Sequence, residues 1–476
     1  MSEEKERVLP AGWTWVEMGD IVREYQPGFA CGSRDAQGYV QLRMNNIGVE
    51  SRVALESVLR VPKRLTNLEK YELKNGDVLF NNTNSPELVG KTVLYRGEID
   101  QCVFSNHISR LRVDESLVVP AWLTWTLVTE QRRGTFQKMC HRFVGQAGIS
   151  RKDLLRLPVS IPPLKEQRRI VAKMEELFEE LRTASDALQK APSTTKQFRQ
   201  SILARALLGE LTERVDGDAN QSSMNTELET RDQVSRRRRP MDEAARRPKL
   251  PTGWSWVHFR DICNAQNGRS FPSRFYTDNG IRLLRPGNLH SSGKLIWTSQ
   301  NTRFLPTSFA DKYPNFIIGP GEIVMNLTAQ SLKDEFLGRV CITEEDTHCL
   351  LNQRLARIRP HLDLNPKYLF WILKSPHFRD FVHGLESGTL IQHMFTSQLG
   401  NFVLPVAPPK EQQLVVARIE EMMLTIENVD INLNDGQRRL KEVEQSILAK
   451  AFKGELVLQD PQDEPVSQLL QRMKHI

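Results

Sequence analysis

Residues 9–16 read Leu-Pro-Ala-Gly-Trp-Thr-Trp-Val, and residues 250–257 repeat them as Leu-Pro-Thr-Gly-Trp-Ser-Trp-Val. Further stretches recur in the same order: PLKEQ at 163–167 as PPKEQ at 408–412, SILARA at 201–206 as SILAKA at 446–451, and GEL at 209–211 as GEL at 454–456. The separation is 241 residues at the first match and 245 at the others. The chain is therefore an internal duplication in which the segment after each Lys-Glu-Gln kept its length, while the preceding domain changed by four residues.

Each half is expected to contain one domain followed by one helical segment, because 476 residues exceed one ordinary core. Short strand-like runs alternate with Gly, Asn and Pro turns in both domains, which predicts an α+β fold with two mixed α/β domains in tandem. The expected boundaries are 1–163 for domain 1, 164–211 for helical segment 1, 212–248 for a flexible charged linker, 249–409 for domain 2, 410–457 for helical segment 2 and 458–476 for a C-terminal tail.

Heptad spacing of apolar residues follows each Lys-Glu-Gln and predicts two long helices. The seam of the first is Ile170, Met174, Leu177, Leu181, Ala184, Leu188 and Ala191; that of the second is Val415, Ile419, Met422, Ile426, Val429, Leu433, Gly436, Leu440, Val443 and Ile447. Each helix could pack on its own domain, but equal lengths favour pairing with each other as an antiparallel coiled coil with pseudo-twofold symmetry. About 44 helical residues span roughly 65 Å, close to two turns of DNA.

Composition narrows the class of protein. The formal net charge is +7, from 65 Lys and Arg against 58 Asp and Glu, which mildly favours a polyanionic partner. The six cysteines are dispersed without a Cys-x-x-Cys pair, which predicts reduced thiols and no zinc site. The charged start MSEEKERV and the lack of a long apolar run predict neither a secretory signal nor a membrane span, and therefore a cytoplasmic protein.

Motifs of catalysis are missing from the sequence. It contains no Gly-x4-Gly-Lys-Ser/Thr phosphate loop, no His-Glu-x-x-His, no Gly-x-Ser-x-Gly and no Asn/Asp-Pro-Pro-aromatic stretch. We therefore predict no catalytic site and no metal site on this chain. The basic run Arg236–Arg239 in the linker could contact phosphates or remain solvated, and the sequence leaves both readings open.

With these repeats assembled, the chain resembles the specificity subunits of type I restriction–modification systems. The resemblance is carried by Leu-Pro-x-Gly-Trp and its copy, by Pro-Pro-Leu-Lys-Glu-Gln at 162–167 with its near-copy, by 198–204, and by 76–91. The second copy of this last loop, at 325–333, is only loosely similar. The resemblance implies two target-recognition domains, each recognising half of a bipartite asymmetric site in double-stranded DNA. It also implies two docked methyltransferase (M) subunits and motor-nuclease (R) subunits, with S-adenosylmethionine, ATP and Mg on those partners and no cofactor on this chain.

Polar residues after strand ends are the candidates for contacting bases, because Asn and Gln match adenine and Arg and Lys match guanine in the major groove. The predicted DNA-binding residues of domain 1 are Asn45, Asn46, Asn81, Asn82, Asn84, Ser85, Lys91, Asn106 and His107. Those of domain 2 are Arg285, Asn288, Asn326, Gln330, Lys333, Asn352, Gln353 and Arg354. For each one, a turn-capping Asn or a solvated Arg is the competing interpretation. The competing functions are the specificity portion of a fused restriction enzyme and a coiled-coil adaptor without a DNA role.

Overall fold

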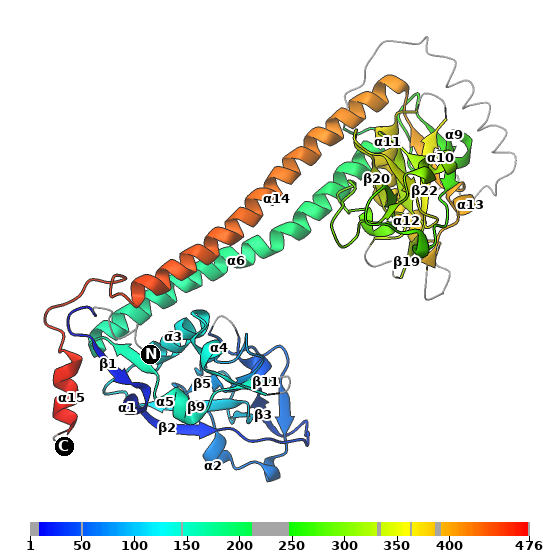
Figure 1. Ribbon diagram of the computed structural model, residues 1–476. Coiled ribbons are helices and arrows are strands. Elements are labelled where there is room, and N and C mark those ends of the chain that lie inside the picture. Colours follow the sequence, from blue (N-terminus) through cyan, green and yellow to red (C-terminus); the bar gives the residue numbers. More distant parts are fainter. Residues whose placement is uncertain are drawn as a thin grey trace. The chain divides into compact units, whose positions relative to one another are not determined.

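The computed structural model describes residues 9–48, 51–143, 146–211, 247–330, 335–361, 364–385 and 392–474. The chain divides into two compact units, unit 1 (Met1–Leu188 with Gly436–Ile476) and unit 2 (Gln189–Asp435). Each unit holds one α/β domain and part of both long helices, α6 (Leu164–Ala206) and α14 (Pro409–Ala451) (Figure 1). The predicted fold class, two mixed α/β domains each followed by a long helix, is confirmed.

Unit 1 contains one α/β domain that is built from short strands and helices. Its strands are β1 (Thr14–Glu17), β2 (Val22–Pro27), β3 (Tyr39–Leu42), β4 (Leu59–Val61), β5 (Val78–Asn81), β6 (Thr83–Asn84), β7 (Thr92–Leu94), β8 (Val103–Phe104), β9 (Ile108–Val113), β10 (His141–Phe143), β11 (Gln146–Gly148) and β12 (Pro158–Ile161). Its helices are α1 (Met18–Ile21), η1 (Met44–Asn46), η2 (Lys63–Leu65), α2 (Leu68–Tyr71), α3 (Pro120–Arg132), α4 (Thr135–Met139), α5 (Arg151–Leu155) and α15 (Val466–Lys474).

Unit 2 repeats this arrangement. Its strands are β13 (Ser255–His258), β14 (Cys263–Asn267), β15 (Ile281–Leu284), β16 (Phe304–Leu305), β17 (Ile317–Ile318), β18 (Ile323–Asn326), β19 (Thr328–Ala329), β20 (Val340–Ile342), β21 (Cys349–Leu351), β22 (Leu355–Pro360), β23 (Gln392–His393) and β24 (Val403–Val406). Its helices are α9 (Phe259–Ile262), η3 (Ser273–Phe275), η4 (Pro286–Asn288), α10 (Ser308–Lys312), η5 (Pro314–Phe316), α11 (Pro366–Leu373), α12 (Pro376–His383) and α13 (Thr396–Leu399).

The sheets of the two domains share one strand order, except that the second sheet of unit 2 has an additional strand, β17, next to β21. A four-stranded sheet has the order β2-β9-β5-β7 in unit 1 and β14-β22-β18-β20 in unit 2. A second sheet pairs β3 with β8 in parallel and with β4 antiparallel, and unit 2 repeats this as β15 with β21 and β16. The alternating apolar residues of these strands build the cores, in which Leu79 and Val324 are fully buried at matching positions. The duplication seen in the sequence is therefore a duplication of the fold.

The two long helices pair antiparallel within each unit. In unit 1 the start of α6 packs on the end of α14, with Ile170 and Met174 in one core with Ile447. In unit 2 the end of α6 packs on the start of α14, where Leu203 shares a core with Val415. This is the coiled-coil pairing that the heptads predict.

Some predicted seam residues are nevertheless exposed. Val429, Val443 and Ala184 all lie at solvent-exposed positions of their helices. A pair of helices buries only a narrow stripe of each, so a regular heptad does not ensure burial at every repeat. Pro192 lies inside α6, which continues through it.

The repeated motifs join each domain to the helices. The indole Nε1 of Trp13 donates to Glu166 Oε2 at 3.2 Å, and in unit 2 Trp254 donates to Glu411 at 2.7 Å. The fully buried Gln167 side chain donates to the carbonyls of Leu117 and Pro162. The Leu-Pro-x-Gly-Trp and Lys-Glu-Gln stretches are therefore the joint between the first strand of each domain and the first turn of its helix.

Each long helix is followed by a glycine with positive φ, Gly209 at 69° and Gly454 at 71°. In this conformation the next residue, Glu210 or Glu455, bonds back to a carbonyl of the last helical turn, and only glycine adopts it without strain. A Cβ on Gly209 would lie 2.5 Å from Pro251 Cγ, and one on Gly454 would lie 2.7 Å from Pro10 Cγ. Each Leu-Pro stretch thus packs against the end of a long helix.

The segment expected as a C-terminal tail packs on unit 1. Val466 of α15 is buried with 1% exposure, and its amide donates to the Gly12 carbonyl at 3.1 Å. Asp463, buried with 2% side-chain exposure, pairs with Arg169 at 2.7 Å. Asp463 and Val466 therefore pack beside the joint at Trp13. Most of the expected linker, 212–246 with Arg236–Arg239, lies outside the described residues.

Candidate nucleic-acid interface

Strand ends of domain 1 converge on one edge, which we call edge 1. Because β3 and β8 run parallel, with Leu42 beside Phe104, the segments that follow them leave on the same side. These segments are Arg43–Asn46 and Ser105–His107. The Ser105 amide donates to the Leu42 carbonyl at 2.9 Å, which fixes the two segments next to each other. The predicted residues Asn45, Asn46, Asn106 and His107 are thus brought together although 60 residues separate them in sequence.

The segment after β5 reaches edge 1 as well. Asn81, the last residue of β5, pairs with Ile108, the first residue of the antiparallel β9. The Asn82 amide donates to the His107 carbonyl at 3.1 Å, and the Asn81 amide donates to the Lys91 carbonyl at 2.8 Å. Asn84 and Ser85 follow directly, so the structure gathers all nine predicted residues of domain 1 at edge 1.

Domain 2 repeats this convergence as edge 2. The parallel strands β15 and β21 end side by side, and the Asn352 amide donates to the Leu284 carbonyl at 3.1 Å. Arg285 and Asn288 follow β15, and Gln353 and Arg354 come after β21. Asn326 at the end of β18 pairs with Leu355, and Gln330 lies four residues later. Lys333 is outside the described residues.

A glycine at each edge permits the close approach of a third segment. A Cβ on Gly28 would lie 2.3 Å from the Ser105 carbonyl oxygen, and one on Gly268 would lie 2.2 Å from that of Asn352. Real Cβ atoms do not come so close to a backbone oxygen, so any side chain would push the strands apart. The chain after each glycine therefore runs directly across its edge.

Several predicted asparagines hold the edges together. Asn46 is 1% exposed, accepts the Arg43 amide at 2.9 Å and donates to the Ala54 and Ser57 carbonyls. Asn288 is fully buried and accepts the Arg285 amide at the same 2.9 Å. Because these amide groups are already satisfied by the backbone, their evident role in the free chain is to fix the turn.

A second pair of buried asparagines, Asn81 and Asn326, also binds backbone carbonyls at the edges. The Asn81 amide nitrogen donates to the Thr83 and His107 carbonyls, and that of Asn326 donates to the Thr328 and Phe336 carbonyls. Both side chains are fully buried. Asn82 is 9% exposed and donates to the Ser109 hydroxyl at 2.8 Å.

Other predicted residues face solvent to varying degrees. The exposed ones are Asn45, Asn106, Gln330, Gln353 and Arg354, and the half-buried ones are Asn84, Ser85, Lys91, His107, Arg285 and Asn352. Partial burial lowers the pKa of Lys91 from its ordinary value. Whether any of these residues contacts DNA stays a prediction.

The structure adds residues to the edges that the sequence analysis did not single out. Phe29 and Arg269 directly follow Gly28 and Gly268, and the glycine repeat was the available signal. The hairpin β10–β11 also borders edge 1, because Ala147 pairs with Asn84 of β6. Arg142 on this hairpin is exposed, and nothing in its local sequence distinguished it from other surface arginines.

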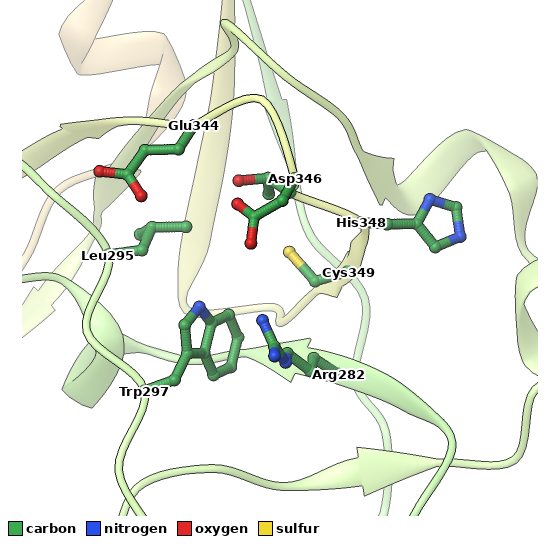
Figure 2. A pocket seen from close by; sticks show the side chains of 8 residues that line it. Arg282, Leu295, Trp297, Glu344, Asp346, His348 and Cys349 are labelled. Atoms are coloured by element: carbon green, nitrogen blue, oxygen red, sulfur yellow. The ribbon is translucent and has the colours of Figure 1, made fainter.

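The pocket drawn in Figure 2 lies away from edge 2. Figure 2 shows the carboxylates of Glu344 and Asp346 across the pocket from Trp297 and Arg282. Arg282 pairs with Cys349 at the end of β15 and β21 opposite to Leu284. Two carboxylates disfavour a phosphate, so this pocket does not extend the candidate interface.

The described residues offer neither a metal site nor a membrane-spanning helix. Within these ranges, no group of three or more His, Cys, Asp or Glu side chains could hold a metal ion. No helix in the same part of the chain is long and apolar enough to cross a membrane.

Comparisons with known proteins point to one family. Residues 43–189 match the family model described as "Type I restriction modification DNA specificity domain". The chain is 25% identical over 350 residues to the EcoDI type I restriction enzyme specificity subunit of Escherichia coli, covering 73% of this chain and 72% of that protein. It is 23% identical to the EcoKI specificity subunit of Escherichia coli K12, covering 95% and 90%.

Solved structures share the fold. The crystal structure of the HsdS subunit from Thermoanaerobacter tengcongensis aligns with a TM-score of 0.53 at 21% identity, covering 96% of this chain and all of that one. A chain from a structure of a type I R-M system, described in terms of complex assembly and conformational transition, aligns with a TM-score of 0.67 at 21% identity over 94% of this chain and all of that chain.

Proposed function

We propose that this chain, which belongs to the family of type I restriction–modification specificity subunits, recognises a bipartite asymmetric DNA sequence for its partner enzymes. The observation that carries the proposal is the duplicated edge. Two copies of one arrangement, each with its own exposed set of polar residues, suit two half-sites. Because the exposed residues differ between the copies, the half-sites should differ as well.

Recognition would use the side chains that the free chain leaves exposed. Asn45 and Asn106 at edge 1 carry the amide groups that match adenine, whereas Arg354 and Gln353 at edge 2 can address guanine and adenine. The buried asparagines would act by positioning these residues. The net charge of +7 favours approach to DNA, so binding should weaken as salt rises.

Partner subunits would dock on the helices. Leu424 and Ile431 of α14 are 60% and 59% exposed and lie one heptad apart on the same helix face. Phe198 of α6 is 54% exposed. Large apolar side chains exposed on a helix are typical of a protein interface. We propose that methyltransferase and motor-nuclease subunits supply S-adenosylmethionine, ATP and Mg²⁺ together with the chemistry, and that this chain supplies recognition.

Reconstitution tests the proposal. The chain with its methyltransferase subunits should methylate adenine at a bipartite site, found by sequencing methylated bases, while the chain alone should show no turnover. Exchanging residues 9–163 for the same domain of a relative should change one half-site and leave the other intact. Methylation without a bipartite site, or a simultaneous change of both halves, would contradict the proposal.

A further inference from the structure

The residue after the edge glycine lies at the centre of each edge. In domain 2 the Arg269 amide donates to the Leu351 carbonyl at 3.0 Å, and its own carbonyl accepts the Gln353 amide at 2.9 Å. In domain 1 Phe29 makes the corresponding bonds: its amide donates to the Phe104 carbonyl, and its carbonyl accepts the Asn106 amide. Phe29 and Arg269 therefore make the same backbone hydrogen bonds and differ in their side chains.

A tyrosine supports this side chain in both domains. The Phe29 ring lies 4.6 Å from the Tyr71 ring between centroids, and the Arg269 guanidinium lies 4.4 Å from the centroid of Tyr313. Both tyrosines follow a lysine, Lys70 or Lys312, whose ammonium lies over the ring. The tyrosine is therefore a repeated platform that carries Phe in one domain and Arg in the other.

The platform leaves the polar edge of the guanidinium available. Arg269 is exposed and makes no ion pair with any residue in the described part of the chain. Stacking on an aromatic ring fixes the plane of a guanidinium while its N–H groups remain free to donate. Such a fork matches the O6 and N7 atoms of guanine in the major groove. Arg285 and Arg354 flank it at edge 2, which concentrates positive charge there.

We infer that Arg269 is a specificity-determining residue that recognises a guanine in the half-site of domain 2. This inference rests on the proposed DNA recognition and names one base contact within it. Phe29 has no donor to offer, so the corresponding position in the other half-site should not depend on a guanine in this way.

The chain itself supplies the variant that tests this. Arg269→Phe places in domain 2 the residue that domain 1 carries on the same platform, so the packing on Tyr313 has a precedent. Arg269→Lys keeps the charge but loses the fork. Arg260→Ala is the matched control, because Arg260 is an exposed arginine in α9, at the opposite end of the strand that leads to Arg269.

Each variant is co-expressed with the methyltransferase subunits, and methylated sites are sequenced from a library with randomised half-sites. For Arg269→Phe, preference for guanine at one position of the domain 2 half-site should fall on the order of 10- to 100-fold, with the other half-site unchanged. Arg269→Lys should retain part of that preference, and Arg260→Ala should match the wild type. The half-site of domain 2 is the one that changes when residues 249–409 are exchanged.

Other outcomes have distinct meanings. If the wild type yields no bipartite site, the proposed function itself fails. If the wild type yields one and Arg269→Phe keeps every base preference, the inference is wrong. Weaker binding to all sequences, with a salt dependence reduced by about one counterion, would assign Arg269 to a phosphate and would also overturn it. The melting temperature of each complex shows whether a loss reflects assembly.

Discussion

The Asn81→Ala variant tests whether Asn81 holds the turns of edge 1 in place and does not itself contact DNA. Its amide nitrogen donates to the Thr83 carbonyl at 3.1 Å and to the His107 carbonyl at 2.8 Å, in a fully buried position. A net contribution of about 0.5–1.5 kcal/mol for each bond gives a loss of roughly 1–3 kcal/mol. Asn326→Ala should cost the same, since its bonds to Thr328 and Phe336 measure 2.7 and 2.9 Å.

Hydrogen exchange of the full chain is the appropriate assay, because two units need not unfold in one step. In Asn81→Ala, the free energy of opening obtained from the exchange rates of the β5 and β9 amides should be lower by roughly 1–3 kcal/mol. The control is Asn45→Ala, at an exposed position of the same edge, which should leave protection within about 0.5 kcal/mol and reduce recognition of the first half-site. If Asn81→Ala kept full protection and lost base preference, its side chain would have to leave these bonds for DNA, and the scaffold role would be refuted.

Three further predictions concern the helices and their joints. Truncation after Leu458 removes α15 and the buried Val466, so unit 1 should lose thermal stability while unit 2 keeps its hydrogen-exchange protection; equal protection in unit 1 would contradict this. A second change inserts one heptad after Leu188 in α6 and one after Asp435 in α14. These points lie next to each other, because Leu188 lies against Gly436. Each helix then becomes longer by about 10.5 Å. The half-site gap in sequenced methylated sites should grow by about three base pairs, and an unchanged gap with full activity would exclude the helices as spacer. Burial raises the pKa of Glu166, so the stability that its protonation confers is present at low pH and is lost as pH rises through the raised pKa. The free energy of unfolding of the wild type relative to Glu166→Gln should therefore decrease with rising pH in that window, and a pH-independent difference would argue against it.

The sequence determined the organisation of this chain. The repeated motifs and their spacings predicted two domains and two helices of equal length, because duplication and heptad periodicity are local and countable. Strand ends rich in Asn and Arg also predicted which segments form the edges. Those segments were recognisable because turn residues follow runs of buried apolar residues along the chain itself.

Only the tertiary structure decided which polar side chains remain available. Parallel pairing of β3 with β8 joins residues 62 positions apart, such as Leu42 and Phe104, and no local pattern encodes a non-local pairing. Asn46 and Asn81 are buried and bonded to backbone carbonyls, whereas Asn45 and Asn106 face solvent, although all four are the same residue type. In domain 2 the corresponding pairing of β15 with β21 places Asn352 beside Arg269, which stacks on Tyr313, 44 residues later in the chain. Residue type and spacing are thus read from the sequence, whereas exposure follows from the packing of strands that are distant in the chain.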